Sequence, residues 1–328
     1  MIISKTPLRI SFFGGGTDYP DYFKQHGGAV LSTSIDKYVY ITVNQLSLIS
    51  EHRYKATYSK VEHCQSIDEI AHPSIRECLR FLEINDGIEV HSISDLPAKT
   101  GLGSSSTFTV GLLNALYAYK NQVISSIKLA QEAIYVEQKL IGEKVGVQDQ
   151  SAAAVGGLNY FEFKQDGSIT YKPVVLSQER KNAFKNHLLL FYTGVQRFAE
   201  DVLKEQIDKT KSGEASKDLS HIRKMVDYGY EILTSNKNLL EFGDLLHQAW
   251  ASKKNLSAAI SSNYLDEMYD LAMKAGAIGG KLLGAGGGGF FLFFASPEKH
   301  QKIRLALENY KEINFSFDND GSKIIFIH

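Results

Sequence analysis

The sequence predicts a globular protein of mixed helices and strands, divided into two domains. Its 328 residues are enough for two domains with cores of their own. Strand-like runs rich in β-branched and aromatic residues, such as 34–43, occur together with amphipathic helix-like runs, such as 126–141. The composition becomes polar and charged over 164–186, which favours a boundary there. We therefore expect domains of about 1–180 and 181–328.

The composition excludes several classes of function. The formal net charge of −1 shows no basic bias, which argues against a nucleic-acid surface. The two cysteines, Cys64 and Cys78, lack the spacing of a zinc site, and so few cysteines favour a reducing compartment. Residues 1–7 show no secretory signal pattern, and the longest uncharged runs, near 100–119 and 282–296, are typical of buried core. We expect a cytoplasmic protein without a nucleic-acid or membrane partner; its oligomeric state stays open.

A glycine- and serine-rich stretch at 97–111, Pro-Ala-Lys-Thr-Gly-Leu-Gly-Ser-Ser-Ser-Thr-Phe-Thr-Val-Gly, organises the chain. It follows a strand-like run and precedes an uncharged helix-like run at 108–119. Its glycines permit a tight turn, and its serines would meet the free N–H groups of the helix, an arrangement that binds phosphate. A plain turn with a serine N-cap is the alternative. The predicted phosphate-binding residues are Gly101, Leu102, Gly103, Ser104, Ser105 and Ser106.

This stretch, Pro-x-x-x-Gly-Leu-Gly-Ser-Ser, resembles the second signature motif of the GHMP kinases, the family of galactokinase, homoserine kinase, mevalonate kinase and phosphomevalonate kinase. The resemblance implies a two-domain α+β fold. Its amino-terminal domain would be the β-α fold shared with a ribosomal protein, and its carboxy-terminal domain would be ferredoxin-like, with the active site between them. It also implies ATP and Mg²⁺ as cofactors.

Residues 7–18, Pro-Leu-Arg-Ile-Ser-Phe-Phe-Gly-Gly-Gly-Thr-Asp, place an arginine among apolar neighbours and then three glycines. A hairpin turn is the simple interpretation, but Arg9 within an apolar strand indicates a negatively charged partner. The stretch resembles the first GHMP motif and is most similar to the form in bacterial D-glycero-D-manno-heptose 7-phosphate kinases. That resemblance puts Arg9 near the transferred phosphate and assigns the sugar to Gly15, Gly16, Thr17 and Asp18. Glycines in place of a glutamate and a histidine argue against galactose.

Glu137 falls within the apolar stripe of the helix-like run 126–141. A carboxylate turned into a core is costly unless a cation or strong donors meet it. The alternative is an edge position, with the side chain reaching water or a lysine. In the family resembled, a glutamate at this place holds the nucleotide-bound magnesium, which implies a site of Glu137 with Ser104 and Ser105.

Asp149 lies in Gly-Val-Gln-Asp-Gln at 146–150. Its residue type and position fit a helix N-cap. The segment also resembles the family motif whose aspartate is the proposed base for the attacking hydroxyl, twelve residues after the metal glutamate. Arg9 close by would keep this carboxylate ionised and stabilise charge on the phosphoryl group. Whether Asp149 removes the proton or only orients the hydroxyl stays open.

Basic residues in the second half offer anion sites. Arg197 follows a strand-like run at 188–193 and precedes a helix, where it would hold an anionic group of the substrate or lie in solvent. Lys253 and Lys254 end a helix-like run, either as surface charges or as a site for a phosphate on the substrate.

A second glycine-rich stretch occupies 276–289, with eight glycines in fourteen residues before an apolar strand. So many glycines form neither a good helix nor a good strand, and the buried strand that follows excludes a linker. The stretch resembles the third GHMP motif, Lys-x-x-Gly-Ala-Gly-x-Gly-Gly. That motif would pack beside the phosphate loop and line the substrate cleft through Gly286 and Gly287.

Together the motifs predict transfer of the ATP γ-phosphate to the anomeric hydroxyl of a heptose 7-phosphate, giving the 1,7-bisphosphate for a nucleotide-activated heptose of surface polysaccharide. One alternative is a kinase for another sugar, such as L-fucose. A second is a sensor that binds sugar or nucleotide without turnover, although Asp149 and Glu137 are both present. The hypothesis of a dinucleotide-dependent oxidoreductase has less support, because the glycine spacing of the dinucleotide-binding fingerprint is missing.

Overall fold

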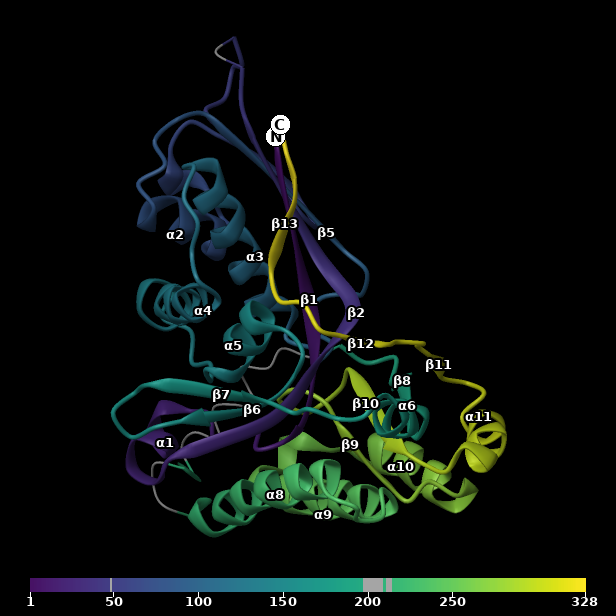
Figure 1. The fold of residues 1–328 in the computed structure, drawn as a ribbon. Helices are drawn as coiled ribbons and strands as arrows, with labels where there is room; N and C mark the ends of the chain where they lie inside the picture. Colours follow the sequence, from purple (N-terminus) through teal and green to yellow (C-terminus); the bar gives the residue numbers. More distant parts are fainter. Residues whose placement is uncertain (48, 197–208, 211–213) are drawn as a thin grey trace.

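The computed structural model describes residues 1–47, 49–196, 209–210 and 214–328. Figure 1 shows two units, each a sheet with helices packed beside it. The larger sheet has nine strands and is built mainly from the first half of the chain, whereas a four-stranded sheet is built from the second half. The predicted α+β architecture of two units is thus confirmed.

The first sheet has the order β13-β1-β2-β5-β3-β4, and the hairpin β6–β7 and strand β12 are attached through β2. Its pairings are antiparallel except for β3 on β5. The long strand β2 pairs with β1, β5, β6 and β12, so it is the centre of the sheet. The strands are β1 (Ile2–Phe13), β2 (Gly28–Gln45), β3 (Tyr54–Thr57), β4 (Val61–Cys64), β5 (Ile88–Ser94), β6 (Leu158–Phe163), β7 (Ile169–Pro173), β12 (Phe317–Asp318) and β13 (Lys323–Ile327).

Helices α2 to α5 lie on one side of this sheet (Figure 1). The central one is α3, which packs on β1 and β2 and is buried along most of its length. Its apolar residues face every direction, as expected of a helix inside a core. The helices of this unit are α1 (Pro20–His26), η1 (Ile67–Glu69), α2 (Pro73–Phe81), α3 (Ser104–Tyr119), α4 (Ser126–Tyr135), the π-helix η2 (Val136–Ile141) and α5 (Gln148–Val155).

The second sheet is antiparallel with the order β11-β8-β10-β9. All five residues of β10, Phe-Phe-Leu-Phe-Phe, are buried, because neighbouring elements cover both faces of this central strand. The strands are β8 (Leu188–Tyr192), β9 (Gly279–Leu282), β10 (Phe290–Phe294) and β11 (Lys311–Glu312). The helices are α6 (Gln178–Asn186), α8 (Ser216–Thr234), α9 (Leu240–Leu256), η3 (Ala258–Ile260), α10 (Asn263–Ala275), η4 (Pro297–Lys299) and α11 (His300–Ala306).

Aromatic side chains join the two units. The Phe12 ring of β1 lies 5.4 Å from the rings of both Phe184 and Phe242, and those two rings are 4.8 Å apart. The end of the chain also returns to the first sheet, where β13 pairs with β1 and the two termini meet (Figure 1). The units therefore share a core, and the boundary near residue 180 remains a prediction.

Local structure departs from the expected pattern at the helix predicted over 126–141. The α-helix ends at Tyr135 and continues as a π-helix. A π-helix has i→i+5 hydrogen bonds in place of i→i+4, so its extra residue changes the direction of the side chains that follow. Such π-helical turns occur frequently at functional sites. Glu137 lies in this turn and is fully buried. No helix in the described residues is both long and apolar enough to span a membrane.

Candidate active site

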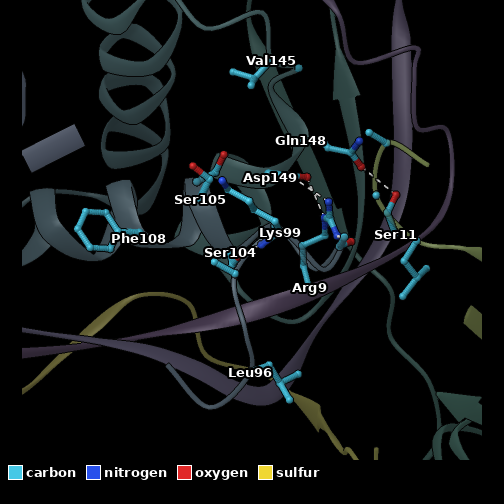
Figure 2. Close-up of a pocket in the computed structure, with 18 of the residues that line it drawn as sticks. Arg9, Ser11, Leu96, Lys99, Ser104, Ser105, Phe108, Val145, Gln148 and Asp149 are labelled. Carbon is cyan, nitrogen blue, oxygen red and sulfur yellow. Dashed lines mark hydrogen bonds and ion pairs between the residues drawn. The ribbon is translucent and has the colours of Figure 1, made fainter. Parts of the chain in front are cut away.

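A cleft of about 930 Å³ lies where the two units meet. The three predicted motifs all contribute to its wall, although they are far apart in the sequence. Figure 2 shows Arg9, Ser104 and Asp149 arranged around it, from β1, α3 and α5 respectively. The sequence prediction of one shared site is consistent with this arrangement.

The second and third motifs pack against each other through backbone. Gly101 has a φ of +83°, and a Cβ there would lie 2.4 Å from the carbonyl oxygen of Leu283. A Cβ on Gly284 would in turn lie 2.4 Å from the Gly101 Cα. Only glycine permits both the positive φ and this close approach. The two glycine-rich stretches therefore form one backbone floor.

The serines of the second motif begin α3, as predicted. Gly103 is the N-cap with a φ of +78°, and Ser104, Ser105 and Ser106 follow as the first helical residues and line the cleft. The free N–H groups of this first turn and the helix dipole favour an anion at this end. This end of α3 can bind phosphate.

Arg9 and Asp149 form a two-pronged ion pair in the cleft (Figure 2). Arg9 Nε donates to Asp149 Oδ1 and Nη2 donates to Oδ2, each at 2.8 Å. Arg9 Nη1 donates to the Gly101 carbonyl at 2.7 Å. The arginine side chain is 3% exposed and the aspartate 27%, so the carboxylate is the member that a ligand can reach. This geometry fixes the guanidinium between the carboxylate and the phosphate loop.

Asp18 is a second carboxylate of the cleft, and it is buried. It accepts hydrogen bonds from the backbone N–H groups of Gly16 at 2.9 Å and Gln148 at 3.4 Å. Burial, and then the charge of Asp149, raise the pKa of Asp18 to about 6. A Cβ at Gly146 would lie 1.9 Å from Asp18 Oδ2, so any larger residue there would displace the Asp18 carboxylate.

Glu137 is buried behind the first turn of α3. The Ser106 hydroxyl donates to its Oε2 at 2.9 Å and the Gln150 amide donates to the same oxygen, while Oε1 has no partner. Burial raises the pKa of Glu137 to about 7, and hydrogen bonds to the carboxylate offset part of that rise. Of the three serines of the second motif, Ser106 is the one that donates to Glu137, whereas the sequence prediction named Ser104 and Ser105.

A carboxylate oxygen without a partner beside a phosphate-binding turn fits a magnesium ion, which prefers one or two carboxylates together with phosphate oxygens and water. Glu137 and Ser106 are the residues here that would hold it. The described residues contain no group of three or more His, Cys, Asp or Glu side chains that could bind a metal alone.

The remaining predicted residues lie as follows. Thr17 is buried and its hydroxyl donates to the carbonyls of Gly14 at 2.8 Å and Ala29 at 2.9 Å, so it closes the turn of the first motif. Gly287 donates its N–H to the Ile260 carbonyl at 2.9 Å. Arg197 lies outside the described residues. Leu102 is buried and its carbonyl accepts the Arg9 N–H, whereas Gly15, Gly16 and Gly286 line the cleft.

The structure adds residues that sequence reasoning missed. An aromatic group lines one end of the cleft: the His72 ring stacks on Phe108 at 4.7 Å, and Tyr58 meets His72 edge-on at 4.7 Å. The sequence gave no signal for Tyr58 or His72, because isolated aromatic residues in a polar segment carry no pattern. Gln148, which accepts a hydrogen bond from Ser11, also lines the cleft (Figure 2).

Comparisons with known proteins identify the family. The model of the GHMP kinases N terminal domain matches residues 71–157, and that of the GHMP kinases C terminal domain matches 231–312, together about half of the chain. The chain belongs to the GHMP kinase family. Both GHMP domains are present, and the first turn of α3 lies within the amino-terminal match.

Relatives of this GHMP kinase include sugar kinases. The chain is 29% identical to the D-glycero-alpha-D-manno-heptose 7-phosphate kinase of Campylobacter jejuni over 98% of both chains. It is 27% identical to the galactokinase of Pyrococcus furiosus, over 92% of this chain and 91% of that one. A solved D-glycero-D-manno-heptose 1-phosphate kinase from Bacteroides thetaiotaomicron superposes with a TM-score of 0.81 over the whole of both chains, at 24% identity, which supports the fold.

Proposed function

We propose that this GHMP kinase transfers the γ-phosphate of ATP to the anomeric hydroxyl of D-glycero-D-manno-heptose 7-phosphate, giving the 1,7-bisphosphate. The product would serve the synthesis of nucleotide-activated heptose and of surface polysaccharide. The observation that carries the proposal is the Arg9–Asp149 pair, held in one cleft with the first turn of α3 and with Asp18. The similarity to a heptose 7-phosphate kinase over 98% of both chains supports the acceptor.

The nucleotide would lie with its phosphates at the first turn of α3. The aromatic end of the cleft, formed by Tyr58, His72 and Phe108, offers a stacking surface for the adenine base. Bound magnesium would neutralise charge on the phosphate oxygens.

The acceptor would lie between Asp18 and Asp149. The half-buried carboxylate of Asp149 accepts the proton of the attacking hydroxyl, or holds that hydroxyl in line with the γ-phosphate. The Arg9 guanidinium, fixed by three hydrogen bonds, stabilises the charge that develops on the transferred phosphoryl group. No covalent intermediate with the protein is needed, since positioning and electrostatics carry phosphoryl transfer.

A neutral sugar is the competing acceptor. The chain is 25% identical to an L-fucokinase/L-fucose-1-P guanylyltransferase of Bacteroides fragilis over 94% of this chain, which spans about a third of that longer protein (36%). ADP release with magnesium-ATP, measured for heptose 7-phosphate, unphosphorylated heptose, L-fucose, galactose and mevalonate, separates the candidates. We expect turnover with heptose 7-phosphate and its loss in Asp149→Asn. Turnover with fucose would identify L-fucose as the acceptor. Tight nucleotide binding without turnover on any of these substrates would favour a sensor.

A further inference from the structure

Two lysines enter the cleft from the second unit. Lys253 comes from the last turn of α9 and Lys281 from β9, and both line the same cleft as Asp18. Lys281 is 6% exposed, and its ammonium donates to the carbonyls of Ser11 at 2.9 Å and Phe12 at 2.8 Å. The charge of Lys281 is thus placed at the end of β1.

Neither lysine is neutralised by these contacts. Lys253 donates to the carbonyl of Gly284 and lies 3.4 Å from that of Leu282. An ammonium group has three donors and the carbonyls take two, leaving one donor on each lysine. Within the described chain neither ammonium forms an ion pair with a carboxylate. The neighbouring Lys254 does, with Asp266 at 3.2 Å.

Positive charge is therefore in excess at this end of the cleft. Burial, and then the charge of Arg9, lower the pKa of Lys253 to about 8. Burial, followed by the charges of Lys253 and Arg9, holds the pKa of Lys281 well below its usual range. Arg9 is already matched by Asp149. An anion bound between the lysines would relieve their repulsion and stabilise both charged forms.

The position of the lysines favours the acceptor over the nucleotide. The carbonyls that hold Lys281 directly precede the glycine turn 14–18, which ends in the buried carboxylate of Asp18. The charge of Asp18 also acts on Lys253. The first turn of α3 already offers the nucleotide phosphates a site of their own.

We propose that Lys253 and Lys281 together bind a phosphate group carried by the acceptor sugar, and so select phosphorylated over neutral sugars. This inference rests on the proposed function and assigns residues to its substrate specificity. Such a pair acts as two point charges with free donors, which suits a phosphate ester better than a hydroxyl.

The test measures a preference: kcat/KM for heptose 7-phosphate divided by kcat/KM for unphosphorylated heptose, from ADP release at saturating magnesium-ATP. Lys253→Gln removes the charge while its amide still donates to the Gly284 carbonyl. Loss of one charged hydrogen bond lowers the preference by about tenfold or more. Lys253→Arg keeps the charge and retains most of the preference. Lys254→Met is the matched control on the same helix, and it leaves the preference unchanged.

Three further results decide between explanations. An undiminished preference in Lys253→Gln overturns the inference. If the KM of this variant for ATP also rises, Lys253 serves the nucleotide and not the acceptor sugar. A wild-type enzyme that prefers a neutral sugar overturns the proposed function itself. If the glutamine variant unfolds at the assay temperature, Lys253→Met and Lys253→Arg, compared at a lower temperature, still separate charge from structure.

Discussion

Neutralising Glu137 should stabilise the magnesium-free protein while it impairs catalysis. The pKa of Glu137 is raised from 4.5 to about 7, chiefly by burial. An acid with a raised pKa in the folded state loses stability as pH rises from its unfolded pKa to its folded pKa. At 1.36 kcal/mol per pH unit, the buried charge costs about 3 kcal/mol at pH 8 and about 1 kcal/mol at pH 5.

Glu137→Gln removes the buried charge, although its amide brings N–H donors that offset part of the gain. The glutamine oxygen can accept the hydrogen bonds that Ser106 and Gln150 now donate to Oε2, and its amide nitrogen takes the place of the unpartnered Oε1. In EDTA at pH 8 we expect a variant up to about 3 kcal/mol more stable, with Tm raised by up to about 4 °C for a chain of this size. The gain should be about 2 kcal/mol smaller at pH 5.

Thermal unfolding of both proteins across pH 5 to 8, with urea titrations at the two ends, measures this difference. Glu308→Gln, at an exposed position, is the control and should change stability by less than about 0.5 kcal/mol. In Glu137→Gln, turnover with magnesium-ATP should fall about 10- to 100-fold or more, because the neutral amide is a poor ligand for a hard cation. A stability difference that is absent at pH 8, or that is the same at every pH, would refute the reasoning.

Three other substitutions and one pH profile test the remaining geometry. Arg9→Lys keeps the charge but loses the two-pronged contact to Asp149. In an assay of ADP release, kcat should therefore fall about 100-fold or more, with little change in KM for ATP. An unaltered kcat would contradict a role of Arg9 in stabilising the transferred phosphoryl group. Gly146→Ala would press a methyl group into Asp18 and should raise the sugar KM about tenfold, while ATP binding, measured calorimetrically, stays the same. The sugar kcat/KM should fall as pH drops below about 6, because protonated Asp18 accepts fewer hydrogen bonds; a profile flat from pH 5 to 8 would show that its charge is not needed. Gly101→Ala should cost about 1–3 kcal/mol in a urea titration, because both the φ and the contact to Leu283 exclude a Cβ; an unchanged midpoint would mean that the two loops can separate freely.

Much of the fold was predictable because local pattern and tertiary structure agree. The apolar, uncharged sequence of α3 indicated a buried helix, and it is the central helix of its unit. The hairpin β6–β7 was not predicted, because β7 is largely exposed and polar and its strand conformation comes from pairing with β6. The return of β13 to the first sheet also has no local signal, since only long-range pairing places it there.

The site was predictable where backbone chemistry restricts residue type. Glycines with positive φ at the second motif and an arginine within an apolar strand are local anomalies, and both mark the cleft. The π-turn that buries Glu137 depends on packing rather than on propensity, so the sequence indicated the residue but not its partner Ser106. His72 and Lys281 reach the cleft only through tertiary structure.

We propose that the Arg9–Asp149 pair carries phosphoryl transfer to the anomeric hydroxyl of a phosphorylated heptose. The most direct test is ³¹P NMR of the reaction of magnesium-ATP with heptose 7-phosphate, with correlation of each phosphorus to sugar protons. We expect a new phosphate resonance coupled to the anomeric proton beside the unchanged 7-phosphate, and its absence with Asp149→Asn. A new phosphate coupled to any other sugar proton, or one formed equally fast by Asp149→Asn, would contradict the account.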